Sequence, residues 1–333
     1  MPHHSDHTVR RHPLATRILY RSPALAAAAL VALAAPAAAF AHGDEVPIDQ
    51  LPGAWRFEVT PIVASLVVLG LFLRAWLKLR GRGRADHASY THLALFSAGV
   101  LVALGALVSP LDAIGEEYLL VAHMAQHQLL LDVSPALAML GLRGPIGAFL
   151  IPAPVLGPLA RNRGVRAVFG VVTSWWVALV GFIAAIAAWH IPASYDAALR
   201  HQWIHDLEHL SFAVVGALLW LQIVDPARRE QLSRKSRAVL VIAVLAAVHL
   251  IVHPILLSGG VKYTVYAQQD ERLGGISAIA DQHWSAVFMT TEEVLVLGAA
   301  ILVLAWPMLT RLGAGSVEAR ARELDAQAEG QPD

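Results

Sequence analysis

The chain has 333 residues and no net charge at neutral pH; 56% of its residues are hydrophobic and only 15% are charged. Because an ordinary soluble domain carries about a quarter charged residues, this composition predicts a membrane protein with several spans. The even charge balance offers no basic surface for nucleic acid. The absence of cysteine excludes disulfides, thiolate metal sites, iron–sulfur clusters and thiol nucleophiles.

The N-terminal segment 1–41 has the layout of a secretory signal peptide. A polar region with four arginines precedes an alanine-rich apolar run, and the segment ends on Ala39-Phe40-Ala41, a small-x-small cleavage pattern. Cleavage would leave His42 at the N-terminus, where amine and imidazole together suit copper(II). The alternatives are an ordinary exposed histidine and an uncleaved membrane anchor.

Seven apolar runs follow, each near the ~20 residues that cross ~30 Å of hydrocarbon as a helix. They are predicted at residues 57–77, 91–110, 117–140, 167–189, 204–224, 238–257 and 284–307. The proline- and glycine-rich segment 141–158 is predicted to lie in the interface or to form a re-entrant piece. The expected fold is an all-α, seven-span transmembrane bundle over residues 42–310. A polar cytoplasmic tail at 311–333 is expected to form a short helix that frays into disorder.

The charges of the connections orient this bundle. Lysine and arginine gather after the first, third, fifth and seventh runs, whereas the alternate connections carry acids such as Asp112, Glu116 and Asp196 with fewer basic residues. Positively charged connections stay in the cytoplasm. The sequence therefore predicts an N-terminus outside and a C-terminus in the cytoplasm.

Histidines concentrate at the predicted outer end of the bundle. Three pairs have i, i+4 spacing, which places both members on one face of a helix. These pairs and one further histidine at the end of the fourth run are His123 and His127, His205 and His209, His249 and His253, and His190. Polar side chains in hydrocarbon cost free energy without partners, and a shared metal would supply them. For a single histidine, a hydrogen bond between helices is the alternative.

Acids inside the predicted spans form a second set. Asp132 lies deep in the third run, and Glu292 and Glu293 lie about a third of the way into the seventh. They could orient histidine ligands or carry protons that metal binding releases, or pair with polar groups of another span. Met124 and Met289 could add a thioether, which favours copper(I), although methionine in a span usually serves packing.

One motif suggests a different chemistry. Residues 205–209 match H-x-x-E-H, in which two histidines bind zinc and the glutamate acts as general base. The pattern is short, arises easily in a histidine-rich chain, and here begins a helix expected in lipid. We therefore interpret it as two metal ligands with Glu208 as a helper acid, and keep a membrane zinc hydrolase as an alternative.

Segment 189–220 resembles the central signature of the CtaG-type cytochrome c oxidase assembly factors, a polytopic family associated with caa-type oxidases. The resemblance is carried by WHIP at 189–192, YDAAL at 195–199, then His205, Glu208, His209 and Trp220. HMAQH at 123–127 and Asp281-Gln282 resemble the family's flanking segments, so the resemblance covers roughly Leu93 to Leu309. The chain departs from the pattern at Ser285-Ala286 and Met289-Thr290, in the last span.

The resemblance implies a non-enzymatic protein of the bacterial plasma membrane that helps to mature a haem–copper oxidase. Oxidase subunits would be its partners, and copper on the outer face its cargo. Among the histidines, the preferred candidate ligands are His123, His127, His205 and His209. His190, His249 and His253 are the next candidates. The alternatives are a b-type haem electron carrier with paired axial histidines, the zinc hydrolase, and a scaffold that binds no metal.

Overall fold

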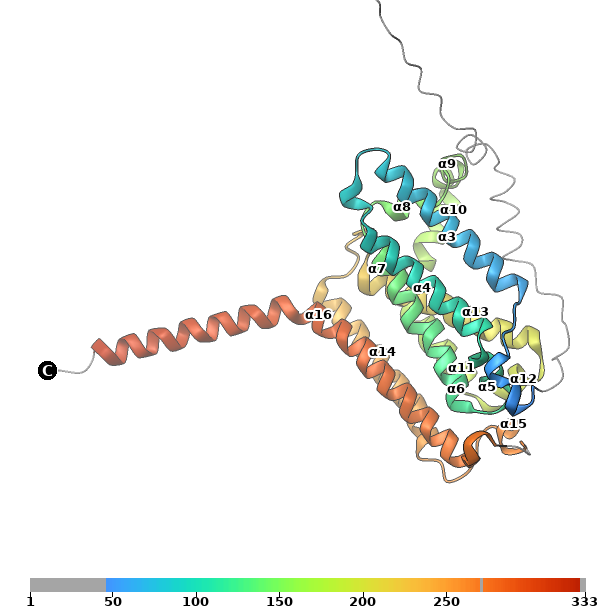
Figure 1. Cartoon of the computed structure of the whole chain (residues 1–333). Helices are drawn as coiled ribbons and strands as arrows, with labels where there is room; N and C mark the ends of the chain where they lie inside the picture. Colours follow the sequence, from blue (N-terminus) through green and yellow to red (C-terminus); the bar gives the residue numbers. More distant parts are fainter. Residues whose placement is uncertain (1–45, 270–271, 330–333) are drawn as a thin grey trace, which may run out of the picture.

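The computed structural model describes residues 46–269 and 272–329, and every regular element in these ranges is helical. Long helices run side by side in one bundle (Figure 1). The short helices α5 (Pro110–Glu117), α12 (Pro192–Arg200) and α15 (Thr264–Ala267) lie at one end, and α8 (Ile146–Leu150), α9 (Ala153–Arg161) and α10 (Arg163–Val172) lie at the other. The predicted signal segment 1–41 and His42 lie outside the described residues.

Five described helices are long and apolar enough to cross a membrane. They are α3 (Val59–Arg80), α4 (Tyr90–Val108), α13 (Gln202–Val224), α14 (Arg234–Leu256) and α16 (Ala278–Glu329), the last as far as Thr310. The all-α membrane fold predicted from the sequence is confirmed, and these five helices match five of the seven predicted runs. The count of seven spans is not confirmed.

The fourth predicted run, 167–189, is bent. α10 and α11 (Trp175–Trp189) meet at an angle of 55°, and together they make a sixth candidate span. The break falls at Thr173 and Ser174, whose hydroxyl groups donate to the carbonyl groups of Phe169 and Val171. Such local hydrogen bonds compete with the helix ladder, so the apolar run alone does not predict the bend.

The third predicted run consists of three consecutive helical pieces. α6 (Leu120–Gln128) leads through the π-helical turn η3 (Leu129–Val133) into α7 (Ser134–Gly141). Pro135 has no N–H and cannot bond to the carbonyl group of Leu131, four residues earlier. That carbonyl group faces Gly216 of α13, where an added Cβ would lie 2.0 Å from its oxygen. The proline and the glycine thus accommodate a π-turn where two helices touch.

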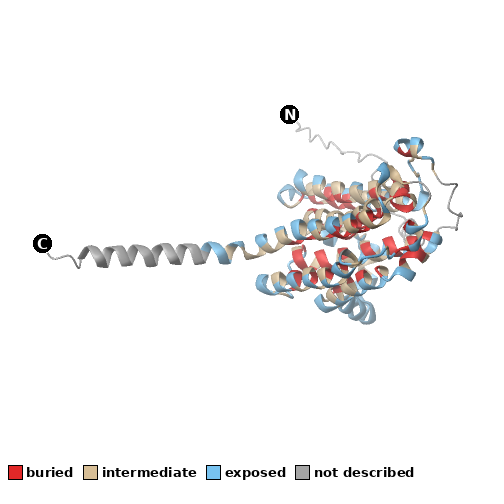
Figure 2. Ribbon diagram, turned by 90° about the horizontal axis from the view of Figure 1, so that it is seen from below, coloured by how far each residue is buried: buried red, intermediate tan, exposed pale blue. Residues whose placement is uncertain are grey.

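Three apolar cores hold the described part of the bundle together. The largest joins α6, α11, α12, α13, α14 and α16. The second joins α3, α4 and α8 around Phe72 and Phe96, whose rings stack at 4.0 Å, and the smallest contains Leu51, Ala113 and Tyr118. Buried residues face the interior while many exposed positions on the outside are also apolar, as at Leu66, Val214 and Leu250 (Figure 2). An apolar exterior of this kind is suited to lipid.

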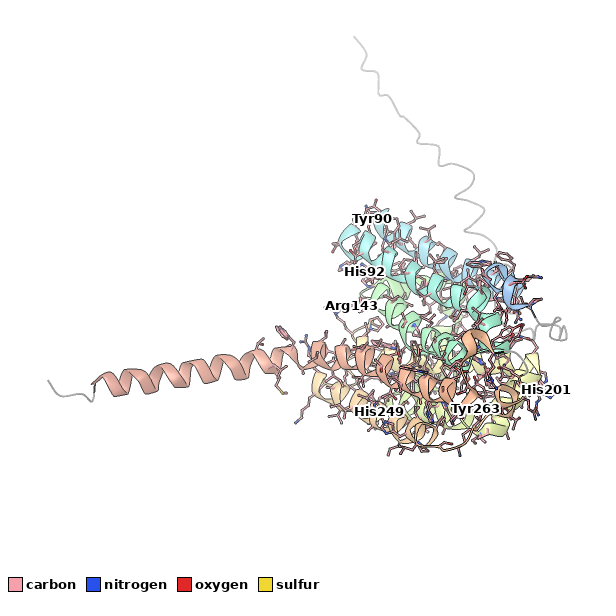
Figure 3. The ribbon with its side chains drawn as sticks, turned by 60° about the horizontal axis from the view of Figure 1, so that its bottom comes forward. Tyr90, His92, Arg143, His201, His249 and Tyr263 are labelled. Atoms are coloured by element: carbon pink, nitrogen blue, oxygen red, sulfur yellow. The ribbon has the colours of Figure 1, made fainter. Side chains whose placement is uncertain are left out.

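The two ends of the bundle differ in charge. His92 and Arg143 lie at the end that carries the arginine-rich connections, whereas His201 lies at the opposite end (Figure 3). The segment 141–158, predicted to be interfacial or re-entrant, forms α8 and the start of α9, and Arg74 of α3 donates to the carbonyl groups of Phe149 and Leu150. The tail beyond residue 310 continues α16 as one helix to Glu329 (Figure 1).

Candidate metal site

Four histidines from two helices meet inside the bundle, near the end that carries α5, α12 and α15. His123 and His127 come from α6, and His205 and His209 come from α13. Their rings lie 4.0 to 5.9 Å apart, centroid to centroid, for each of the five closest pairs. All four side chains are buried, with at most 7% of each residue exposed. We call these four residues the histidine cluster.

The histidine cluster contains two overlapping groups that could hold an ion. One potential ligand atom from each of His123, His127 and His209 lies within 4.8 Å of the others, and the same holds for His123, His205 and Glu208. The i, i+4 pairs of α6 and α13 therefore lie together, and Glu208 of the H-x-x-E-H motif lies beside them. That these residues bind a metal stays a prediction.

The contacts of His123 determine which of its ring nitrogens can bind a metal. Its Nδ1 lies 2.7 Å from the hydroxyl group of Tyr195 and 3.1 Å from that of Tyr266. Because the Tyr266 hydroxyl group donates its proton to the carbonyl group of Gly115, its oxygen accepts from His123. Nδ1 therefore carries the proton, and Nε2 of the neutral ring presents a lone pair.

The ring of His205 is also fixed by a hydrogen bond at Nδ1, in this case to a carboxylate. Its Nδ1 lies 2.8 Å from Oε1 of Glu116, so it donates to this carboxylate. Nε2 of His205 then faces Nε2 of His123 at 3.2 Å. Two lone pairs at this separation repel one another unless a shared proton or a cation lies between them. A proton on one of the two nitrogens satisfies this contact as a hydrogen bond, and a cation bound by both nitrogens would replace that proton.

Glu116 is itself fixed by charge. Arg56 forms ion pairs with Asp112, Glu116 and Glu117 above the cluster. Although burial opposes it, the hydrogen bond and charge of His205, together with Arg56, hold the pKa of Glu116 below its usual range. Burial and then the charge of Glu116 raise the pKa of the neighbouring Asp112 to about 7. Glu116 therefore keeps the negative charge that faces His205.

Several buried polar atoms of the site have no hydrogen-bond partner. These are Nε2 of His127, Nε2 of His209 and both carboxylate oxygens of Glu208. Glu208 Oε1 lies 3.8 Å from His127 Nε2, too far for a hydrogen bond. Leaving such groups unpaired costs about 1–3 kcal/mol each, and more when they are charged. A cation bound among them would supply the missing partner, so the donor set fits a metal that prefers imidazole and carboxylate.

Residues far apart in the sequence position this site. Both carboxylate oxygens of Asp281, in α16, accept from the first backbone N–H groups of α6, those of Leu120 at 2.7 Å and Val121 at 3.0 Å. Asp196 of α12 accepts from Thr264 at the start of α15, which carries Tyr266. Each contact fixes the end of a helix, and so places His123 and Tyr266 against one another.

The other predicted ligands lie elsewhere. His249 is partly exposed and His253 is exposed on α14, and the structure does not bring either into the cluster. His190 lines a separate cavity with Met124 and Met289. That these three histidines bind a metal stays a prediction.

The membrane acids form a group of their own near the π-turn. Asp132 accepts a hydrogen bond of 3.1 Å from Trp220 and lies close enough to Glu292 and Glu293 for an electrostatic interaction. The structure shows no contact of these three acids with the histidine cluster, and Glu208 is the predicted helper acid that does lie beside it.

Sequence reasoning missed the side chains that hold the ligands in place. Glu116 and Asp112 were interpreted only as charges that set topology, although their i, i+4 spacing gives them one helix face. Tyr195 lies in the segment that resembles the assembly factors, but its contact with His123 has no signal in the sequence. Tyr266 comes from a connection, where nothing in the local pattern identifies it.

Comparison with known proteins gives one match. A family model described as the cytochrome c oxidase caa3 assembly factor matches residues 70–311. This range covers well over half of the chain and contains the histidine cluster, Glu116, Tyr195 and Tyr266. No curated protein and no solved structure matched the chain.

Proposed function

Because the chain belongs to the cytochrome c oxidase caa3 assembly factor family, we propose that its histidine cluster binds a copper ion and delivers or holds it during oxidase assembly. The family resemblance found in the sequence is thereby confirmed. Membership indicates an assembly role and association with cytochrome c oxidase. Copper is the cargo in this proposal, and the protein's part is to bind it and give it up.

The 3.2 Å separation between the Nε2 atoms of His123 and His205 carries the proposal. A metal bound to imidazole has metal–nitrogen distances of about 2.0 Å, so two such nitrogens on one tetrahedral ion lie roughly 3.3 Å apart. Glu116 and Tyr266 accept the protons on the opposite nitrogens of the two rings, so the Nε2 atoms are the ones left facing each other. The site is thus organised before the ion arrives.

The chemistry of the ligands is consistent with copper. Among divalent first-row ions, copper binds most tightly to a given set of nitrogen ligands. The nearby carboxylates of Glu116 and Glu208 would balance its charge in a buried site. Imidazole ligands exchange more readily than a closed set of thiolates, which suits an ion that must be passed on.

Binding should displace a proton. In the absence of a metal, a proton shared between the Nε2 atoms of His123 and His205 relieves the repulsion of their lone pairs. The ion would take its place, and metal binding in general releases protons from its ligands. We therefore expect about one proton per ion from this pair, measurable with an indicator dye in weakly buffered solution.

The location of the cluster suggests where copper is handled. The cluster lies in the first turns of α6 and α13. These turns are at the end of the bundle that carries α5 and α12, opposite α8 and α9 (Figure 1). Positively charged connections face the cytoplasm, so we place the cluster in the outer half of the bacterial plasma membrane. Copper would then be bound from the outer side, as the sequence-based topology predicts.

The geometry favours copper binding over the two alternatives that involve other metal chemistry. Rings packed 4.0 to 5.9 Å apart leave no room for a porphyrin plane between opposed axial histidines. A hydrolase would need its zinc and Glu208 to reach a substrate, whereas these side chains are buried. A visible spectrum of the purified protein tests the haem alternative, because a bound haem gives a Soret band.

Titration of purified apo-protein with copper tests the proposal. We expect stoichiometric binding by the wild type and its loss in the double variant His123→Ala, His209→Ala. The matched control is His249→Ala, His253→Ala, which removes an equally spaced pair and should leave the affinity of the cluster unchanged. Absence of binding, or equal binding by both double variants, contradicts the copper role of the cluster.

A further inference from the structure

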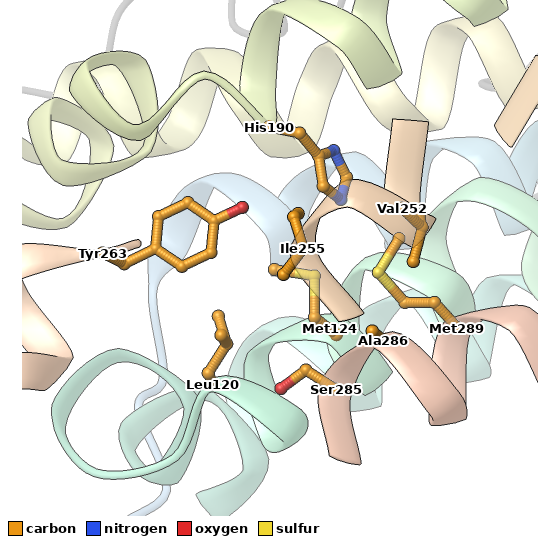
Figure 4. A pocket seen from close by; sticks show the side chains of 9 residues that line it. All are labelled: Leu120, Met124, His190, Val252, Ile255, Tyr263, Ser285, Ala286 and Met289. Atoms are coloured by element: carbon orange, nitrogen blue, oxygen red, sulfur yellow. The ribbon is translucent and has the colours of Figure 1, made fainter. Parts of the chain in front are cut away.

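A second group of metal-binding side chains lies beside the histidine cluster. Met124 of α6, Met289 of α16 and His190 at the end of α11 point into one small cavity (Figure 4). The space open to the centre of a water-sized sphere is about 10 Å³, close to the least that holds one water or one ion. We call this space the thioether cavity.

His190 presents a lone pair to this cavity. Its Nδ1 lies 2.8 Å from the carbonyl oxygen of Ile186, and because a carbonyl group only accepts, Nδ1 carries the proton. Nε2 is therefore the unprotonated nitrogen of the neutral ring. It is buried without a hydrogen-bond partner, and the ring is directed into the cavity (Figure 4). An unpaired acceptor of this kind calls for a cation or a donor.

The rest of the lining selects the kind of cation. Both methionines are buried, and their sulfur atoms lie within the cavity (Figure 4). The remaining walls are mainly apolar, with Leu120, Val252, Ile255 and Ala286; the hydroxyl residues Tyr263 and Ser285 complete the lining, and no carboxylate belongs to it. Thioether ligands favour copper(I). A site with neutral ligands and apolar walls also favours a single positive charge over a double one, since burying charge is costly.

We propose that the thioether cavity is a second metal site, which takes copper(I) through His190, Met124 and Met289. This inference rests on the proposed copper function for the identity of the ion. The geometry itself specifies a soft, singly charged cation, for which silver(I) is a redox-inert equivalent.

The two sites are neighbours. Met124 follows His123 directly in α6, so the two side chains leave the helix about 100° apart. His190 is close enough to His127 for their charges to interact. The same helix thus separates a nitrogen-rich site with nearby carboxylates from a sulfur-containing site without them.

X-ray absorption at the copper edge tests this assignment on whole protein loaded anaerobically with excess copper(I). We expect sulfur as well as nitrogen ligands in the wild type, and loss of the sulfur contribution with one bound ion per chain in Met124→Leu, Met289→Leu. Leucine nearly conserves the volume of methionine. The matched control is Met139→Leu, because Met139 packs against the same core but does not line the cavity. The Met139→Leu variant should keep both the sulfur contribution and the wild-type number of bound ions.

The outcomes separate this inference from the proposed function. Nitrogen ligands alone in the wild type, or a sulfur contribution unchanged by the double substitution, overturns the thioether site while leaving the histidine cluster intact. Sulfur ligation that persists in His123→Ala, His209→Ala supports the thioether site independently of the cluster. If the double methionine variant fails to fold, the wild-type spectrum and its change in His190→Phe decide the question. Silver(I) titration gives the same comparison without oxidation.

Discussion

Three histidine pairs have the same i, i+4 spacing but differ in burial and in their hydrogen-bond partners. The pairs on α6 and α13 are buried, face each other, and have ring nitrogens paired with Glu116 and Tyr266. The pair on α14 is turned outward: His253 is exposed, and Nδ1 of His249 bonds to the carbonyl group of Leu245 in its own helix at 2.7 Å. The rings of this pair lie 5.2 Å apart and nearly perpendicular.

The difference shows what makes a site out of a histidine motif. Spacing decides that two side chains share a face, but it does not decide what that face meets. At α6 and α13 the facing helix brings a second pair, and two connections bring groups that accept the Nδ1 protons. At α14 the bonded nitrogen of His249 uses the nearest backbone carbonyl group, as an isolated helical histidine can. The residues that accept the Nδ1 protons therefore distinguish the cluster on α6 and α13 from the pair on α14, whereas the i, i+4 spacing does not.

The largest effect is expected from His205→Ala in cells that depend on this protein for oxidase assembly. Loss of this ligand also removes one of the two partners of Glu116, leaving only Arg56, so we expect oxidase of greatly reduced copper content. His253→Ala, its counterpart on α14, should give oxidase with normal copper. Purified oxidase can be analysed for copper in both strains. Normal oxidase from the His205 variant would favour the scaffold alternative, in which no histidine ligand is needed.

The second prediction concerns the contact between the two helices that carry the cluster. In Gly216→Ala the new methyl group would lie 2.0 Å from the Leu131 carbonyl oxygen, so the helices must separate. Overpacking costs 1–3 kcal/mol, occasionally more, and we expect about 3 kcal/mol or more here. Thermal unfolding in detergent should show a clearly lower midpoint. The control is Gly181→Ala, whose methyl group would meet only the Val215 side chain at an ordinary 3.7 Å; equal midpoints would show that the contact is loose.

A smaller effect is expected from Glu116→Gln. The amide retains the shape but removes the negative charge that fixes the Nδ1 proton of His205, and loss of such a supporting group typically weakens metal affinity about 10–100-fold. Competition with a chelator of known affinity measures the change. Glu292→Gln removes a membrane acid that lies near Asp132, and should leave the affinity unaltered. A change of equal size in both variants would indicate a general effect of charge.

The smallest effect is expected from Tyr195→Phe. Its hydroxyl group contacts Nδ1 of His123 at 2.7 Å, and one hydrogen bond contributes about 1 kcal/mol, so affinity should fall about five-fold while Tyr266 still holds the ring. Tyr263→Phe is the control, because the Tyr263 hydroxyl group has no hydrogen-bond partner although its ring lies only 4.3 Å from that of Tyr195. Competition with the same chelator compares the copper affinities of the Tyr195→Phe and Tyr263→Phe variants. Equal affinities would assign the support of His123 to Tyr266 alone.

The long helices could be predicted because a membrane span needs a long apolar run, and α3, α13 and α14 begin and end within a few residues of the predicted runs. What the runs do not reveal are the internal irregularities. The π-turn depends on Pro135, which cannot donate to the Leu131 carbonyl group, and on Gly216 of another helix, which that carbonyl group faces. The bend before Trp175 depends on two hydroxyl groups. The hydropathy of an apolar run is an average over many residues, so it does not reveal the π-turn or the bend.

The candidate site was predictable to the level of its ligands. Regular spacing on helices identifies His123, His127, His205 and His209, since periodicity carries over directly into shared faces. The supporting groups come from irregular connections, where a residue's neighbours are set by tertiary contacts. Tyr266 reaches His123 only because Asp196 fixes the start of α15. That Asp132, Glu292 and Glu293 orient ligands or carry protons stays a prediction.

The π-turn has a consequence for how this chain tolerates insertions and deletions. One residue of an α-helix corresponds to about 100° of rotation and 1.5 Å of length. Removing a single residue between His127 and Pro135 would shorten the helix little, but would turn both histidines away from α13. The direction of these two histidines is therefore set by a residue count, and a related sequence that keeps every histidine but changes this count would turn them away from His205 and His209.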